Sequence, residues 1–413
     1  MSALTAAPQP DGRIAPQPWM SEAATEAVLK ALVAEGGGAR FVGGCVRDAL
    51  LGRAIGDIDI ATPLRPEEVM RRLEAAGIRA VPTGLAHGTV TAVVASRHFE
   101  VTTLRRDVET FGRHARVQFT DDWAEDARRR DFTMNALFLD VSGNVFDPVH
   151  GLPDVLAGQV RFVGDAATRI REDVLRLLRF YRFHAHYGQG AADAEARAAC
   201  RALAALLPSL SGERVAAETL KLLRAPDPLP TLRMMAEDGV LAAFLPEARH
   251  FGRLAALLPL EPAPDALRRL GTLLDDDAGT AAAVAQRLRL SNEESERLVR
   301  AASPPVAVDL ASDERAQRRA LHRLGADLYR DLVLRRAAES GDAARTRALL
   351  ALAEAWRPLE FPLKGRNVTA LGVPAGPEIG RLLAAVAQWW EDGDFRADRK
   401  AALAELKRRV AER

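Results

Sequence analysis

The pattern of hydrophobic and polar positions over the first 150 residues predicts a mixture of helices and strands. Helices are expected over residues 21–35, where Ser21 is the N-cap, and over 65–76. A third helix is expected to begin near Cys45, directly after a glycine pair. Alternation rich in β-branched residues predicts strands at 39–42, 57–60, 88–95 and 98–104.

The pattern changes from about residue 165 onward. Ala, Leu, Arg and Glu dominate there, and helices separated by Pro and Gly fill the remaining chain without a fixed repeat period. We therefore predict an α+β fold, in which an N-terminal head with a small mixed β-sheet and helices precedes an all-α neck, body and tail. The expected segments are a disordered lead (1–24), the head (25–150), the helical neck (151–225), and the helical body and tail (226–413).

Composition narrows the class of protein without deciding its function. The chain has 57 basic and 56 acidic residues, so it lacks the polybasic coat of some nucleic-acid-binding proteins, although basic residues can still gather on one face. Its two cysteines, Cys45 and Cys200, form no CxxC pair, which argues against a zinc site and fits a reducing cytoplasm. No run of 18 apolar residues predicts a membrane span.

The segment Asp57-Ile58-Asp59 carries the most chemical information. In a strand, residues two apart point to the same face, so the two carboxylates would lie together while Ile58 and Ile60 enter the core. Two such carboxylates repel each other unless a cation bridges them, and hard oxygen ligands together with triphosphate oxygens favour Mg²⁺. Taken alone, the pattern is equally typical of a solvated turn.

Two further features extend this pattern. In the segment VGGCVRD (42–48), two glycines after a strand let backbone amides approach a phosphate, and Arg47 can pair with phosphate oxygens or ribose hydroxyls. A third acid is expected on a neighbouring strand, and Glu100 in HFEVTTLR is the candidate. An ordinary turn and an exposed strand acid are the structural alternatives.

These segments together resemble the class II tRNA nucleotidyltransferase and bacterial poly(A) polymerase family of the DNA polymerase beta superfamily. The resemblance covers nearly all of residues 38–225, and the later helices match more loosely. Its motifs are GGCVRD (43–48), DIDIAT (57–62), EVTTLRRD (100–107), RRDFTMNAL (129–137), VFDPVHG (145–151), REDVLRLLRFYRF (171–183) and SGERVAAETLKLL (211–223).

The resemblance implies a role for each matched residue. Asp57 and Asp59 would hold the metal ions, with Glu100 as the third carboxylate and Asp131 as the competing candidate. The residues expected to bind the nucleotide are Gly44, Arg47, Arg130, Asp173, Arg176, Arg179 and Arg182. The head would be catalytic, the neck would select the nucleotide, and the body and tail would bind RNA.

A physical argument for base selection stands beside the resemblance. Asp173 and Arg176 are three apart on the expected helix, where such positions are neighbours, so they can face one base edge together. The carboxylate would accept from the amino group of cytosine or adenine, while the guanidinium would donate to the ring nitrogen. Guanine and uracil carry a carbonyl in place of that amino group, which predicts acceptance of CTP and ATP and rejection of GTP and UTP.

The segment between Arg105 and Arg129 is predicted to include a flexible loop. By resemblance, this loop is linked to the switch from C to A addition, and Asp107, Gly112 and Arg113 fit that pattern. A plain surface loop is the alternative.

The sequence thus predicts a cytoplasmic enzyme that adds CCA to the tRNA 3′ end from CTP and ATP with Mg²⁺, without an obligatory protein partner. A poly(A) polymerase, or a CC-only or A-only tRNA nucleotidyltransferase, uses the same chemistry and stays an alternative. A non-catalytic RNA-binding protein is the alternative from a different class. The intact Asp57 and Asp59 and the Asp173–Arg176 pair count against that last alternative.

Overall fold

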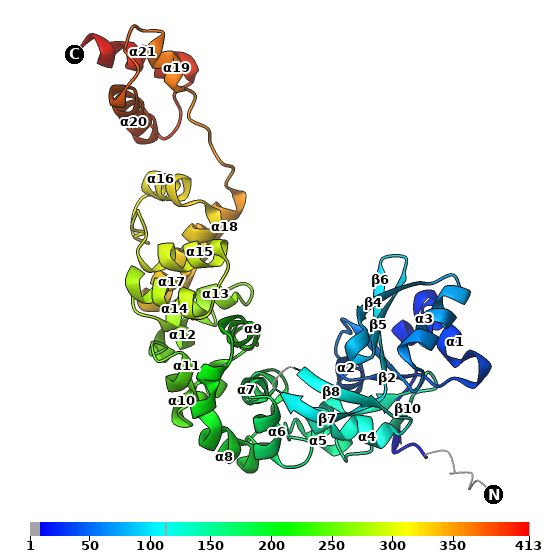
Figure 1. Cartoon of the computed structure of the whole chain (residues 1–413). Coiled ribbons are helices and arrows are strands. Elements are labelled where there is room, and N and C mark those ends of the chain that lie inside the picture. Colours follow the sequence, from blue (N-terminus) through cyan, green and yellow to red (C-terminus); the bar gives the residue numbers. More distant parts are fainter. Residues whose placement is uncertain (1–8, 112–113, 413) are drawn as a thin grey trace, which may run out of the picture. The chain divides into compact units, whose positions relative to one another are not determined.

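The computed structural model describes residues 9–111 and 114–412 and divides into two compact units, residues 1–246 and 247–413 (Figure 1). The first unit holds the expected head and neck and also the start of the expected body. The predicted α+β class, with strands followed by helices, is confirmed. No helix among the described residues is long and apolar enough to cross a membrane.

An eight-stranded mixed sheet forms the centre of the first unit, in the order β1-β10-β9-β2-β3-β6-β5-β4. Its strands are β1 (Gly12–Arg13), β2 (Arg40–Val42), β3 (Ile58–Thr62), β4 (Arg79–Gly84), β5 (Thr89–Val94), β6 (Arg97–Thr103), β9 (Phe138–Leu139) and β10 (Asn144–Phe146). The four predicted strands correspond to β2, β3, β5 and β6, while β1, β4, β9 and β10 were not predicted. Phe41, Ile60, Phe99 and Val101 are fully buried in the core of this sheet.

The first unit also contains helices, some between the strands in the sequence and the others after the last strand. They are α1 (Ala23–Val33), α2 (Gly44–Leu50), α3 (Pro66–Ala75), α4 (Trp123–Arg128), α5 (Leu152–Ala157), α6 (Ala166–Glu172), α7 (Leu175–Tyr187), α8 (Ala194–Leu203), α9 (Gly212–Leu223), α10 (Leu229–Glu237) and α11 (Val240–Phe244). The helix predicted from residue 21 begins at Ala23 with Glu22 as N-cap, so Ser21 does not cap it.

The expectation of a disordered lead is wrong for the described part of residues 1–24; residues 1–8 lie outside the described residues. β1 pairs antiparallel with β10, and the Asp147 backbone N–H donates to Asp11 at 2.6 Å. Trp19 is buried and packs edge-on against Phe41, with ring centroids 4.6 Å apart. This segment therefore completes the sheet edge, and its Trp adds to the core.

The segment predicted to include a flexible loop forms a separate two-stranded sheet. β7 (Arg105–Phe111) pairs antiparallel with β8 (His114–Phe119), and α4 follows. Gly112 and Arg113 lie outside the described residues, so the role expected for them in the switch from C to A stays a prediction.

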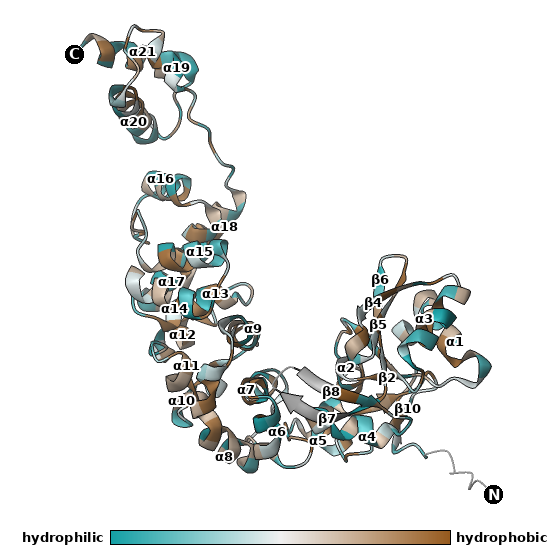
Figure 2. Ribbon diagram, viewed as in Figure 1, coloured by the Kyte–Doolittle hydropathy of each residue, from teal (hydrophilic) through white to brown (hydrophobic). Residues whose placement is uncertain are grey.

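The regular elements that the described residues of the second unit form are all helices, and hydrophilic and hydrophobic residues are mixed along them (Figure 2). They are α12 (Phe251–Leu257), α13 (Ala266–Leu273), α14 (Ala278–Arg287), α15 (Asn292–Ala302), α16 (Glu314–Leu324), α17 (Ala326–Ser340), α18 (Ala343–Ala355), α19 (Gly365–Thr369), α20 (Pro377–Asp392) and α21 (Arg399–Ala411). Leu321, Tyr329 and Val333 lie in one apolar cluster, and Val368, Val386 and Leu406 lie in another.

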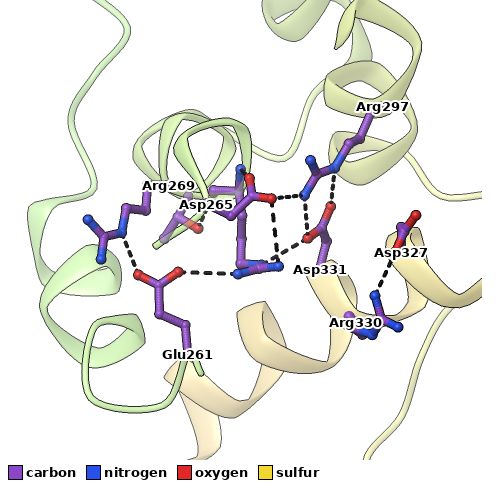
Figure 3. Close-up of polar contacts among 9 residues, drawn as sticks. Glu261, Asp265, Arg269, Arg297, Asp327, Arg330 and Asp331 are labelled. Carbon is purple, nitrogen blue, oxygen red and sulfur yellow. Dashed lines mark hydrogen bonds and ion pairs between the residues drawn. The ribbon is translucent and has the colours of Figure 1, made fainter. Parts of the chain in front are cut away.

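A buried network of ion pairs joins α13, α15 and α17 (Figure 3). Asp331 on α17 accepts from Arg268 Nε at 2.8 Å and from Arg297 Nε at 2.7 Å. Arg297 also donates to Asp265 at 2.8 Å. The Asp331 side chain is only 5% exposed, so its charge depends on these two arginines rather than on water.

Candidate active site

The predicted carboxylate pair lies at the start of β3. Asp57 is exposed and Asp59 half-buried, while Ile58 and Ile60 are buried in the core, which confirms the predicted alternation. β3 pairs in parallel with β6, and the register places Asp59 opposite Glu100. Neighbouring strands lie about 5 Å apart, so this pairing brings the Glu100 carboxylate beside that of Asp59.

The electrostatics of Asp59 reflect that crowding. The pKa of Asp59 is raised to about 6: burial has the largest effect, the charges of Glu100 and Asp57 raise the pKa further, and Arg130 lowers it. A carboxyl group with such a pKa favours a nearby cation. Among the described residues, however, no three or more His, Cys, Asp or Glu side chains are arranged to hold a metal ion on their own.

Gly43 brings the main chain close to this acid group. Its φ of 77° lies in the left-handed region, and a Cβ added there would lie 3.6 Å from Asp59 Oδ2 and 3.8 Å from Arg130 Nη1. Glycine therefore permits the turn from β2 into α2 without strain and leaves space between the carboxylates and Arg130.

A cleft of about 1110 Å³ opens over these groups. All ten residues predicted for the site line it: Gly44, Arg47, Asp57, Asp59, Glu100, Arg130, Asp173, Arg176, Arg179 and Arg182. Residues that the sequence did not single out for the site also line it: Thr83, Thr91, His98, Asn135 and Phe183. Sheet, α2 and α7 thus contribute to one polar cavity.

Asp126 orients the arginines that follow α4. It is 1% exposed and accepts from Arg129 Nε at 2.8 Å and from Arg130 Nη2 at 2.8 Å. Burial works against the Asp126 charge, yet the two arginines hold its pKa below the usual value. The spacing of four between Asp126 and Arg130 is the signal that could have identified this residue from the sequence.

Arg47 is buried, and most of its hydrogen-bonding capacity is used inside the protein. It is 6% exposed, and four of its five N–H groups are used within the protein. Two donate to Asp48, one to Asn135 at 2.7 Å and one to the Tyr187 hydroxyl at 2.6 Å. At most one N–H group, on Nη1, stays available to a ligand in this arrangement.

Asp131 belongs to a chain of polar contacts rather than to the carboxylate cluster. Its Oδ2 accepts from Arg179 Nε at 2.7 Å and its Oδ1 from Asn135 at 3.2 Å. Burial opposes the Asp131 charge, but Arg179 lowers its pKa overall. On α9, the buried Glu218 continues the chain by accepting from Arg182. Asp131 is thus occupied by Arg179, whereas Glu100 lies beside Asp59.

The expected helical spacing of Asp173 and Arg176 is wrong. Asp173 ends α6 in an extended conformation, with φ −149° and ψ 107°, and α7 begins only at Leu175. The Asp173 carboxylate accepts from Arg214, while Arg176 donates to Glu172. The two residues still line the same cleft, but from opposite sides of a break between helices.

Comparison with known proteins places the chain in a family. The profile "Poly A polymerase head domain" matches residues 39–161, and "Probable RNA and SrmB- binding site of polymerase A" matches 192–251. The mouse protein named CCA tRNA nucleotidyltransferase 1, mitochondrial, is 33% identical over 385 residues, which cover 89% of this chain and 86% of the mouse protein. The chain belongs to the CCA-adding enzyme and poly(A) polymerase family of RNA nucleotidyltransferases.

Two further relatives support the membership in this nucleotidyltransferase family. The CCA-adding enzyme of Geobacillus thermodenitrificans is 42% identical over 221 residues, 53% of each chain. The crystal structure of the Bacillus stearothermophilus CCA-adding enzyme in complex with CTP superposes with a TM-score of 0.77 at 28% identity, covering 96% of this chain and 98% of that one. Nucleotidyltransferases of this family generally use divalent metal ions.

Proposed function

We propose that this chain adds C, C and A to the 3′ end of tRNA, using CTP and ATP. The observation that carries the proposal is the convergence of acids for metal binding and arginines for nucleotide binding on a single cleft. Names of the relatives support the choice among RNA nucleotidyltransferases, since the mouse and Geobacillus proteins are both named for CCA addition. A structure of the Bacillus relative also contains CTP.

The roles proposed for the acids follow from their place and chemistry. Asp57 and Asp59 would hold Mg²⁺, with Glu100 as the third carboxylate; few carboxylates suffice because triphosphate oxygens complete the coordination. When bound, the ion would supply Lewis-acid stabilisation of the charge on the transferred phosphate. Glu100 is favoured over Asp131 because Arg179 already pairs with Asp131.

The arginines and the Gly43-Gly44 turn would bind and orient the nucleotide. Arg130, fixed by Asp126, and Arg179, fixed by Asp131, present guanidinium groups in the cleft, where they suit triphosphate oxygens. Arg47 has one donor left for the sugar or a phosphate. Gly44 lines the cleft without a side chain, which leaves room for a ligand.

Base selection is proposed to rest on Asp173 and Arg176, as acceptor and donor. They need not share a helix for this, because both reach the cleft. An acceptor beside a donor complements the amino group and ring nitrogen of cytosine and adenine. Uracil or guanine would leave such polar groups unpaired, at a cost of about 1–3 kcal/mol each.

An extension assay tests the proposal. The protein is incubated with Mg²⁺ and a tRNA transcript that lacks its 3′ CCA, with each labelled nucleotide singly and in mixtures. We expect addition to stop after C, C and A, without use of GTP or UTP. A long A tail from ATP alone would instead identify a poly(A) polymerase, and addition that ends at CC or starts only on a CC end would identify a split activity. No incorporation on any RNA would favour the non-catalytic RNA-binding alternative.

Metal removal is expected to abolish the reaction. With excess EDTA, incorporation of CTP should fall to background, and added Mg²⁺ in excess of the chelator should restore it, because Asp59 and its neighbours otherwise repel the triphosphate. The measurement is initial rate against free Mg²⁺ concentration. Full activity in EDTA would refute the proposed role of the carboxylates.

A cytoplasmic location also stays a proposal, since the mouse relative is named mitochondrial.

A further inference from the structure

A second cavity adjoins the cleft at the start of β3. It has a volume of about 660 Å³ and shares Asp57, Ile58 and His98 with the cleft. We propose that this second cavity binds the sugar–phosphate backbone of the RNA strand directly behind its 3′-terminal nucleotide. This inference rests on the proposed function, and it assigns RNA binding to the head as well as to the body and tail.

Three segments of the first unit form the walls of the second cavity. Its lining residues come from the segment 17–22 before α1, from the loop 53–58 that leads into β3, and from the segment 96–99 at the turn between β5 and β6. Sites for small ligands have volumes of about 300–1,000 Å³, and the second cavity lies within that range. It is therefore large enough for a nucleotide unit of the RNA strand.

The chemistry of nucleotidyl transfer requires that the carboxylates be reached from two sides. The RNA 3′-oxygen attacks the α-phosphorus in line with the leaving pyrophosphate, so the two reactants approach from opposite directions. Arg130, Arg176 and Arg179, which are proposed to bind the nucleotide, line the cleft but not the second cavity. The second cavity meets the cleft at Asp57 without these arginines in its walls, which suits it to the incoming RNA end.

Strand β6 connects the two cavities. His98 and Glu100 are two apart on this strand and both are exposed, so they point to the same face of the sheet. Glu100 lines the cleft, whereas His98 lines both cavities. An RNA strand that passes from the second cavity toward the carboxylates would therefore contact His98 before it reaches Glu100. The imidazole can donate to a phosphate oxygen or pair with a ribose 2′-hydroxyl.

Arg97 supplies a positive charge that a phosphate can take over. Arg97 and Glu22 both line the second cavity, and Arg97 Nη1 pairs with the Glu22 carboxylate at 2.6 Å. The two side chains are 47% and 40% exposed. An ion pair this exposed is weak, because water solvates both charges. A phosphate that enters the cavity can therefore compete with Glu22 for Arg97.

Arg53 supplies a second positive charge in a fixed position. It donates from Nη2 to the His186 carbonyl oxygen at 3.0 Å, and its guanidinium carbon lies 4.5 Å from the centre of the Tyr187 ring. Among the described residues, this bond uses one of its five N–H groups, so the others stay available to a phosphate. Contacts to phosphates read no base, which suits an RNA end whose last nucleotide changes with each addition.

The experiment measures the affinity of Arg97→Gln and Arg53→Gln for both substrates. Each variant should raise Kd for tRNA lacking CCA about three- to tenfold, the range expected for one lost hydrogen bond, and should leave KM for CTP within about twofold. The slope of log Kd for tRNA against log salt concentration should fall by about 0.7 in each variant, the value for one phosphate contact on a single strand. A change of fold stability alone would not alter this slope.

Arg79→Gln is the matched control. Arg79 lies on β4 of the same sheet, is exposed and lines neither cavity, so its replacement removes the same charge from the same unit. Its Kd for tRNA and its salt slope should equal those of the parent. An equal change in Arg79→Gln would overturn the inference, since the total charge of the head would then explain the result.

A modified RNA places the contact at the 3′ end. A methylphosphonate replaces each of the last two internucleotide phosphates of the tRNA in turn, which removes the charge at that position. At the phosphate that Arg97 contacts, the parent should lose about three- to tenfold in affinity, and Arg97→Gln should lose nothing further, because both changes remove one shared contact. Additive losses at both positions would contradict a contact between Arg97 and the RNA end.

The remaining outcomes separate this inference from the proposed function. If the parent adds C, C and A while both variants bind tRNA as tightly as the parent, the inference fails and the proposed function stands. If the parent incorporates no nucleotide, the proposed function fails and the inference fails with it. A higher KM for CTP with unchanged affinity for tRNA would assign the second cavity to the nucleotide, and the inference would again fail.

Discussion

Asp59→Asn is expected to reduce CTP incorporation about a thousandfold or more, as the removal of several kcal/mol of metal-dependent stabilisation implies. Asparagine keeps the shape of Asp59 but not its charge, and Asp59 is opposite Glu100 on the neighbouring strand and two residues from Asp57. The measurement is the single-turnover rate on tRNA lacking CCA at saturating Mg²⁺. Asp227→Asn, an exposed change outside the cleft, is the control and should keep full activity. Near-normal incorporation by Asp59→Asn would remove Asp59 from the proposed metal site.

The same variant should not lose stability in EDTA, because the folded protein disfavours the charge of Asp59. With its pKa raised to about 6, the ionised group destabilises the fold above that pH. This penalty decreases as the pH falls below 6 and disappears below the unfolded value of about 3.9, where the carboxyl is protonated in both states. Asp59→Asn should therefore melt at an equal or higher temperature than the parent at pH 8, and the difference should shrink below pH 6. A large loss of stability at pH 8 would show that inactivity reflects misfolding.

Asp331→Asn is expected to have the largest effect on stability, about 3–5 kcal/mol, the usual cost of removing one partner from a buried ion pair. Arg268 and Arg297 would lose their shared carboxylate in a site where Asp331 is 5% exposed (Figure 3). Burial opposes the charge of Arg297, and Asp331 and Asp265 raise its pKa in compensation. Thermal and urea unfolding of the full chain would measure the loss.

Asp327→Asn supplies the control for Asp331→Asn within the same helix. Asp327 pairs with Arg330, three residues along α17, but its side chain is 84% exposed. Such surface pairs contribute about 0–1 kcal/mol. If the two variants unfold alike, the network in Figure 3 does not stabilise the second unit.

Sequence patterns were most informative where the chemistry is local. Asp57 and Asp59 lie two apart in a strand, so strand alternation alone predicts their shared face and the burial of Ile58 and Ile60. The prediction for Glu100 was that it lies on a strand next to the one with Asp57 and Asp59. The parallel pairing of β3 with β6 puts Glu100 opposite Asp59. Short elements such as β9 and β10 carry too few residues for a periodic signal.

Contacts between residues far apart in the chain could not be predicted from the sequence. The break between α6 and α7 at Asp173 is not marked by Gly or Pro, so a continuous helix was the natural expectation. The partner of Asp173 lies 41 residues away on α9, and that of Arg47 lies 88 residues away at Asn135. Such pairs depend on tertiary packing, which one sequence does not reveal.

The pairing of β1 with β10 has a practical consequence for shortened versions of the chain. A version that begins at the first helix would leave the outer side of β10 without a hydrogen-bonding neighbour. It would also uncover Phe41, against which Trp19 packs. Exposed strand edges next to apolar surface promote self-association. Apparent insolubility of such a trimmed protein would then reflect a missing edge strand rather than a faulty enzyme, and residues 9–22 belong inside its boundaries.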